Sequence, residues 1–299
     1  MSERKPKSKE TIPAGGASRD EERVEPARAT VPDATPDGRP EPGFGAISVV
    51  IPHFRGKDGG ESLRLALRSW ERNFKEPHAI VVIGEREEWI DEERVTFIGM
   101  ERPSDNPNVC LMEAMKAAIA AGEVTDAFVF ATDDVYLVAP VGMAHIDLPK
   151  SVGRLTASST DASVRADTER TLTLLRERGL PLVSYETGLP ALYRKERLVT
   201  LLEEVPEACD GRLLLASFYM GAWNISRPYP LDWRSDPFLL PVVTATPDPT
   251  RFDELLGKKL FLRHSADGYS PFLAGRLREM FPEASACEKA RERETGNGT

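Results

Sequence analysis

The stretch Ala127-Phe-Val-Phe-Ala-Thr-Asp-Asp-Val-Tyr-Leu-Val138 decides the fold predicted for this chain. Its first five residues are mostly apolar, which is typical of a strand buried on both faces of a parallel sheet. The strand ends in two adjacent carboxylates, Asp133 and Asp134, and a second strand-like run follows at 135–138. Ligands of open α/β sheets bind outside the carboxyl ends of the strands, where this pair would lie. Such a pair suits a divalent cation that bridges carboxylates to substrate phosphates, and it equally suits a polar turn.

Segments with strand and helix patterns alternate along the rest of the chain. We expect strands at 47–51, 79–83 and 95–98, and helices at 61–74, 109–121, 167–179, 195–204 and 212–223. A strand or extended loop is expected at 184–193, a polar connection at 261–268, and a last helix that begins at Ser270-Pro271. Asp105 or Asn108 is the expected cap of the second helix. This alternation predicts one Rossmann-like α/β domain, with a mostly parallel sheet and helices on both of its faces.

Composition sets the boundaries of that domain. Residues 1–45 are rich in Pro, Gly, Ala and charge, so we expect a disordered tail before a domain at 46–285. Residues 286–299 are again charged and small, and we expect a flexible C-terminal tail.

Composition also excludes several classes of protein. The net charge of -9 over 299 residues gives no reason to expect nucleic-acid binding, although it does not exclude it. No apolar run is long enough to cross a bilayer, and the first residues lack a secretory signal. The three scattered cysteines fit neither a disulfide framework nor a zinc site, which favours a cytoplasmic location. Neither G-x-G-x-x-G nor G-x-x-x-x-G-K-[ST] occurs, which disfavours dinucleotide enzymes and P-loop ATPases.

The loop after the first strand, 52–60, is rich in glycine and basic groups and leads into a helix. A strand, a glycine-rich loop and a helix in this order place backbone N–H groups where a phosphate can bind. Arg64 and Arg68, one helical turn apart, would face a diphosphate or would pair with Glu61 and Glu71 on a solvated face. The sequence leaves both alternatives open.

Three of these segments together resemble glycosyltransferases of the GT-A type. They are Ile47-Ser-Val-Val-Ile-Pro52, Leu63-Arg-Leu-Ala-Leu-Arg-Ser69 and Phe130-Ala-Thr-Asp-Asp-Val-Tyr-Leu137. The nearer likeness is to Stealth-like sugar-phosphate transferases and related phage and bacterial glycosyltransferases, and it runs from about residue 46 to 281. Two positions depart from the pattern of those proteins: Thr132 replaces an asparagine, and Gly188 stands where relatives tend to carry a histidine.

The resemblance implies a nucleotide-sugar donor, with a UDP-sugar expected, and Mg²⁺ or Mn²⁺ as cofactor. It implies that Asp134 is the principal metal ligand, with Asp133 in support and His264 as a further ligand. Asp133 and Asp134 would also serve catalysis, and either Glu186 takes over the task of the missing histidine or the activity is altered or lost. The expected substrate-binding residues are His53, Arg55, Lys57, Arg64, Arg68 and Asn108.

Three functions fit the resemblance. The first is metal-dependent transfer of a sugar, the second is transfer of a sugar phosphate, and the third is binding of a sugar nucleotide or glycan without catalysis. Release of a nucleoside diphosphate, release of a monophosphate, or binding without turnover would distinguish the three. The sequence does not define the acceptor, for which a glycan, a cell-wall polymer, a protein and a modified DNA base all stay open.

Overall fold

The computed structural model describes residues 46–56, 58–159, 161–223 and 228–289. Lys57, the expected N-terminal tail at 1–45 and residues 290–299 of the expected C-terminal tail lie outside the described residues. The strands are β1 Ile47–His53, β2 His78–Gly84, β3 Val95–Gly99, β4 Ala127–Phe130, β5 Val135–Leu137, β6 Lys150–Ser151, β7 Ala191–Arg194, β8 Tyr229–Pro230, β9 Leu239–Val242 and β10 Phe261–His264. The α-helices are α1 Glu61–Asn73, α2 Pro107–Ala120, α3 Met143–Ile146, α4 Ala162–Glu177, α5 Lys195–Glu204, α6 Leu215–Trp223, α7 Pro249–Leu256 and α8 Pro271–Met280. A 3₁₀ helix, η1 Pro206–Asp210, follows α5.

The central sheet has five strands in the order β3-β2-β1-β4-β7. Neighbours β3, β2, β1 and β4 run parallel, and β7 is antiparallel to β4. The chain leaves β1 toward β2 on one side and later returns to β4 on the other. The strand order therefore reverses between β1 and β4, and such a switch point opens a crevice at the carboxyl ends of the strands.

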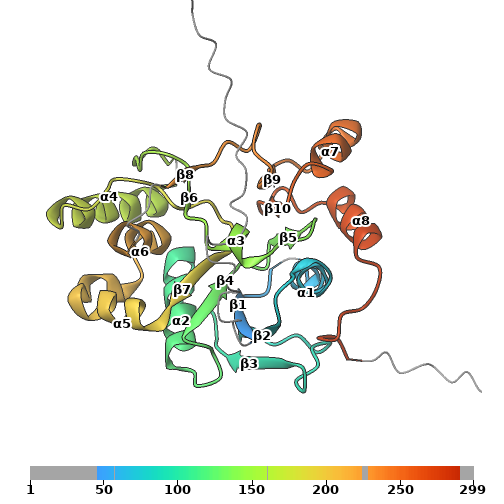
Figure 1. Cartoon of the computed structure of the whole chain (residues 1–299), viewed down its shortest axis with the longest axis horizontal. Helices are drawn as coiled ribbons and strands as arrows, with labels where there is room; N and C mark the ends of the chain where they lie inside the picture. The colour runs from blue at the N-terminus through green and yellow to red at the C-terminus, as the bar shows by residue number, and fades with distance from the viewer. Residues whose placement is uncertain (1–45, 57, 160, 224–227, 290–299) are drawn as a thin grey trace, which may run out of the picture. The chain divides into compact units, whose positions relative to one another are not determined.

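Helices cover both faces of this sheet, because successive residues of a strand point to opposite sides. Val49 and Ile51 pack in a core with Leu67 and Trp70 of α1. Val50, between them, packs in a second core with α2, α4, α5 and α6. Figure 1 shows α1 on one side of the central strands and the four helices of the second core, α2, α4, α5 and α6, on the opposite side. The predicted fold class is confirmed.

A second sheet of three strands, β5-β10-β9, stands next to α1. β10 is antiparallel to β5 and parallel to β9. The expected polar connection at 261–268 is therefore wrong in its first half, where Phe261 and Leu262 are fully buried. Arg263 and His264 made the segment look polar, but main-chain pairing on both sides makes it a strand.

Several predicted boundaries move by a few residues. Asn106, rather than Asp105 or Asn108, caps α2, because its side chain accepts a hydrogen bond from the amide of Asn108. Asp161 caps α4 in the same way, so this helix begins before residue 167. In the expected extended region 184–193, regular pairing is confined to the short strand β7.

None of the helices in the described ranges is long and apolar enough to cross a membrane.

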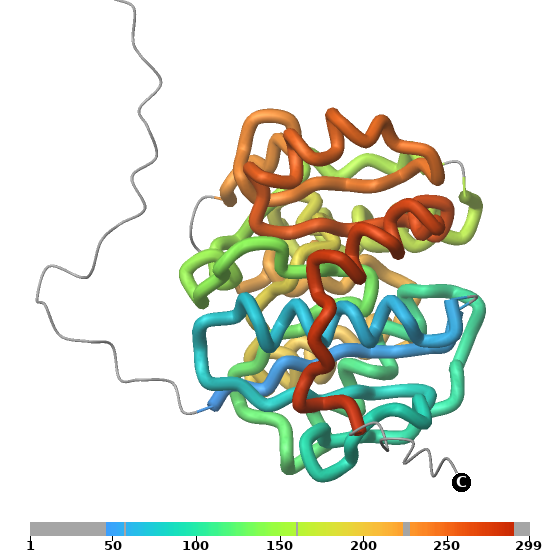
Figure 2. The backbone as a smooth tube through the Cα atoms, turned by 90° about the vertical axis from the view of Figure 1, so that its right-hand side faces the viewer, coloured from blue at the N-terminus to red at the C-terminus, as the bar shows by residue number. Residues whose placement is uncertain are grey.

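Residues 285–289 form a segment that packs against α1 and the loop after β2, so the expected tail from residue 286 is wrong up to Lys289. Figure 2 shows the chain after α8 running across α1. Arg68 donates to Glu288 from Nε at 2.5 Å and from Nη2 at 2.8 Å. Arg64 pairs with the same carboxylate at 3.3 Å and lies over the ring of Trp89. The segment is thus held by a largely buried ion pair.

We expect Arg68→Ala to destabilise the fold by about 3 kcal/mol, because it leaves Glu288 buried and without its main partner. The side chains of Arg68 and Glu288 are only 14% and 7% exposed. Arg276→Ala is the matched control, since its partner Asp253 lies on the surface, and it should cost less than about 1 kcal/mol. Urea denaturation of both variants measures the difference, and equal losses would contradict the assignment.

Candidate functional site

A hydrogen-bonded row of charged side chains crosses the switch point. His53, the last residue of β1, places Nδ1 2.6 Å from Oδ2 of Asp133 beyond β4. Its Nε2 lies 3.0 Å from Oε1 of Glu87, in the loop after β2. Arg55 completes the row, with Nε 2.8 Å from the same Glu87 oxygen. The prediction that the acid pair lies at the carboxyl edge of the sheet is therefore confirmed by its contacts with the end of β1.

Both ring nitrogens of His53 face carboxyl oxygens, so a doubly protonated imidazole donates to Asp133 and Glu87 at once when both carboxylates are ionised. Burial alone would lower the pKa of His53, but the hydrogen bonds and charges of Asp133 and Glu87 raise it above its ordinary value. Burial raises the pKa of Asp133, and the charges of Asp134 and Asp58 add to this increase against the effect of His53. Asp133 is therefore a carboxylate with an increased tendency to accept a proton.

Asp134 engages a different set of partners. Its Oδ1 accepts a hydrogen bond from the hydroxyl of Thr132, and its Oδ2 lies 3.1 Å from Nε of Arg263 on β10. The backbone turns here, because the amide of Val135 bonds to the carbonyl of Thr132. The two adjacent carboxylates consequently point to different cations, His53 and Arg263.

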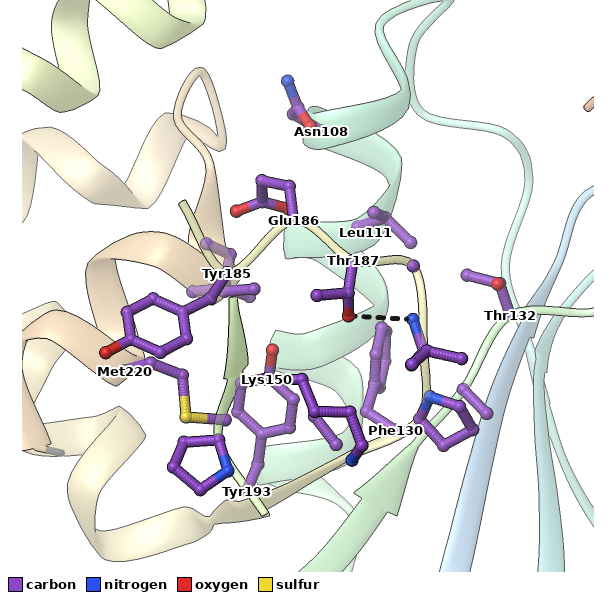
Figure 3. Close-up of a pocket in the computed structure, with 18 of the residues that line it drawn as sticks. Asn108, Leu111, Phe130, Thr132, Lys150, Tyr185, Glu186, Thr187, Tyr193 and Met220 are labelled. Atoms are coloured by element: carbon purple, nitrogen blue, oxygen red, sulfur yellow. Dashed lines mark hydrogen bonds between the residues drawn. The ribbon is translucent and has the colours of Figure 1, made fainter. Parts of the chain in front are cut away.

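A cavity of about 100 Å³ opens beside the acid pair, between β4, β7 and α6. Thr132, which directly precedes the acid pair in the chain, lines this cavity. Figure 3 shows Asn108 and Glu186 at one end of the cavity and Phe130, Tyr193 and Lys150 at the other. Its lining is mainly apolar and aromatic. Burial lowers the pKa of Lys150 to about 8. The cavity has the composition of a small-molecule pocket, with few polar groups on an apolar wall.

Glu186 and Asn108 line this pocket but also hold the fold. Oε1 of Glu186 accepts from both the amide and the hydroxyl of Ser217, each at 2.9 Å, and so caps the first turn of α6. The side-chain amide of Asn108 donates to Asp167 of α4 at 2.8 Å. The catalytic role of Glu186 and the binding role of Asn108 stay predictions.

Two predicted phosphate contacts are wrong. Arg64 and Arg68 lie on the face of α1 that binds Glu288, away from the row at the switch point. Neither arginine forms an ion pair with Glu61 or Glu71: Glu61 pairs with Arg278, and Glu71 accepts from the amide of Ala286. At the N-terminus of α1 the amide of Ser62 already has a partner, because Oδ2 of Asp58 accepts from the amide and the hydroxyl of Ser62, both at 2.7 Å. Arg55 lies at the switch point, where it binds Glu87, and its role in substrate binding stays a prediction.

The side chains present do not fit the expected metal centre. His264 is buried, with Nδ1 2.9 Å from the carbonyl of Ser265 and Nε2 3.1 Å from the hydroxyl of Tyr136, so its prediction as a ligand is wrong. Among the described residues, no group of three or more His, Cys, Asp or Glu side chains could hold one ion. A cation on Asp134 would have to displace Arg263. The dependence of turnover on Mg²⁺ or Mn²⁺ stays a prediction.

Sequence reasoning missed three residues of this site: Glu87, Lys150 and Arg263. Glu87 could have been found, because it follows β2 at the edge where β1 and β4 also end. Lys150 and Arg263 carry no comparable signal, since each lies in a strand that the sequence pattern does not predict.

Comparison with known proteins gives similarity at the level of structure. No protein-family model and no curated protein matches the sequence. A structure of the bifunctional glycosyltransferase WbbM matches with 14% identity and a TM-score of 0.48, over 83% of this chain and 51% of that chain. A glycosyltransferase involved in glycosylation of the major capsid of PBCV-1 matches with 14% identity and a TM-score of 0.38, over 79% of this chain and 98% of that chain. The glycosyltransferase GlyE of Streptococcus pneumoniae TIGR4 matches with 10% identity and a TM-score of 0.41, over 80% of this chain and 61% of that chain.

Proposed function

We propose that this protein is a glycosyltransferase that moves a sugar from a nucleoside-diphosphate sugar, with a UDP-sugar as donor, to an acceptor hydroxyl. The observation that carries the proposal is the His53–Asp133 hydrogen bond of 2.6 Å across the switch point, next to an aromatic pocket. The sequence resemblance to GT-A enzymes supports sugar transfer as the chemistry. The free thiols Cys110, Cys209 and Cys287 support work in the reducing cytoplasm.

Asp133 acts as the general base in this proposal. It removes the proton from the acceptor hydroxyl, whose oxygen then forms a bond to the anomeric carbon of the donor. The bond between that carbon and the phosphate oxygen breaks, and the diphosphate leaves with the electron pair. Burial raises the pKa of Asp133, which brings its proton affinity closer to that needed near neutral pH.

His53 and Glu87 orient this base. The ring of His53 is 1% exposed and is held from both sides, so it fixes Oδ2 of Asp133 in one position. Arg55 balances the charge of Glu87 from the rim of the site, where it is 47% exposed. The second oxygen of Asp133 is the one assigned to the acceptor.

The adjoining pocket receives the transferred sugar in this proposal. The faces of Phe130, Tyr185 and Tyr193 supply the apolar surface against which the C–H groups of a sugar ring pack. Asn108 and Glu186, at the opposite end, supply polar groups for its hydroxyls.

A screen of nucleotide sugars tests the proposal in two steps. A donor should raise the melting temperature of the full chain, and the same donor with an acceptor mixture should release a nucleoside diphosphate. The screen is run with and without EDTA, which tests the predicted metal dependence. Release of a monophosphate would replace the proposal by sugar-phosphate transfer, and stabilisation without turnover would replace it by a binding module. No stabilisation and no product with any donor would reject it.

A further inference from the structure

Arg263 is a partly exposed cation that the fold brings next to the acid pair. In the pairing of β10 with β5, Arg263 lies opposite Val135, the residue that follows Asp134. The ion pair with Asp134 uses Nε, and 40% of the Arg263 side chain is exposed. The two Nη nitrogens have no hydrogen-bond partner among the described residues. Arg263 therefore has donors to spare for a ligand.

Gly188 provides the space for this guanidinium. A Cβ atom at residue 188 would lie 2.2 Å from Nη1 and 2.4 Å from Cζ of Arg263, so any side chain there would displace the group. The backbone of Gly188 also has a φ of 66°, a conformation that favours glycine. The guanidinium thus lies against the bare main chain at the wall of the pocket.

Arg263 consequently lies where the acid pair and the pocket meet. Thr132, which donates to Asp134, lines the pocket together with Glu186 and Gly188. A sugar in the pocket would present its anomeric phosphate toward this boundary. Arginine suits a phosphate group, because its planar fork of N–H donors matches two phosphate oxygens at once.

We propose that Arg263 binds the diphosphate of the donor and balances its negative charge as the sugar leaves. Asp134 orients the guanidinium through Nε and leaves the Nη donors to the phosphate oxygens. When the bond between the anomeric carbon and oxygen breaks, the electron pair stays on the diphosphate, and these donors stabilise it. The inference rests on the proposed function and adds the group that assists the leaving diphosphate.

The test compares Arg263→Gln, Arg263→Lys and Gly188→Ala with the wild-type chain. Binding of UDP and of pyrophosphate is measured by calorimetry with EDTA present, and transfer is measured with and without EDTA. Arg263→Gln should weaken diphosphate binding about 10–100-fold and lower kcat about 10²–10³-fold. Arg263→Lys should recover part of the binding, because it keeps the charge without the fork. Gly188→Ala should resemble Arg263→Gln while it keeps arginine in the sequence.

Arg276→Gln is the matched control, since this arginine pairs with Asp253 and Glu279 on α7 and α8 and should bind as the wild type does. Wild-type affinity and turnover in Arg263→Gln would overturn the inference, as would loss of wild-type diphosphate binding and turnover on addition of EDTA. Diphosphate binding that depends on Arg263, without transfer from any donor, would support the binding role of Arg263 and reject the proposed function instead.

Discussion

Asp133→Asn is expected to lower kcat about 10²–10⁴-fold, because an amide cannot take the proton of the acceptor hydroxyl. The Michaelis constant for the donor should change little, since the diphosphate is assigned to Arg263. The fold should survive: the amide oxygen can still accept from His53, and repulsion with Asp134 and Asp58 is relieved. Initial rates at saturating donor, together with a melting curve, measure both effects.

Asp134→Asn is the paired variant, and its smaller expected loss is about 10–100-fold. Its carboxylate acts on the reaction through Arg263, and removal of such a supporting group usually has an effect of this size. This order reverses the expectation from the acid motif alone, in which Asp134 is the principal metal ligand. Full activity of Asp133→Asn would reject Asp133 as the base.

His53→Ala is expected to destabilise the protein by about 3 kcal/mol or more. The substitution leaves Asp133 and Glu87 at the switch point without the donor between them, and removal of one member of a buried charged set is strongly destabilising. His53 itself is 1% exposed, so water does not replace the hydrogen bonds that the imidazole ring gives to the two carboxylates. Chemical denaturation at neutral pH measures the change in the free energy of unfolding.

His53→Gln serves as control, since its amide group can donate to one of the two carboxylates and should recover part of the stability. The pH dependence of the free energy of unfolding separates the contribution of the His53 charge from that of the packing of its ring. Because the pKa of folded His53 is raised, its contribution is fully present below the unfolded pKa of about 6.5 and is lost as pH rises through the folded value. The stability gap between wild type and His53→Gln should therefore narrow above neutral pH. A constant gap would contradict a charged imidazole.

The sequence predicts the first half of the fold well, because its strands are continuous apolar runs. The runs at 47–51 and 79–83 and the helix at 61–74 differ from β1, β2 and α1 by one or two residues at an end. The second half is predicted less well. β9 and β10 are short, and β10 contains Arg263 and His264, so its burial depends on strands far away in the chain.

The prediction of the site has the same limit: contacts between residues far apart in the sequence are not indicated by a local pattern. Asp133 and His53 could be assigned to one edge, because both follow strands that the apolar pattern reveals. The ion pair between Asp134 and Arg263 joins residues 129 positions apart, which no local pattern indicates. For Arg64 and Arg68 the helical spacing was right but the partner was not. Helical periodicity gives the face of a residue, and the tertiary fold decides what that face meets.

The ion pair of Arg68 with Glu288 also bears on the order in which the chain folds during synthesis. Its two members are 220 residues apart, so α1 emerges from the ribosome long before the carboxylate that will cover this face. N-terminal parts of a chain can fold first, but contacts of high sequence separation close last. Until residues 285–289 arrive, Arg64 and Arg68 lack the carboxylate of Glu288. Translation arrest before residue 285 should therefore leave a nascent chain whose α1 is still sensitive to protease.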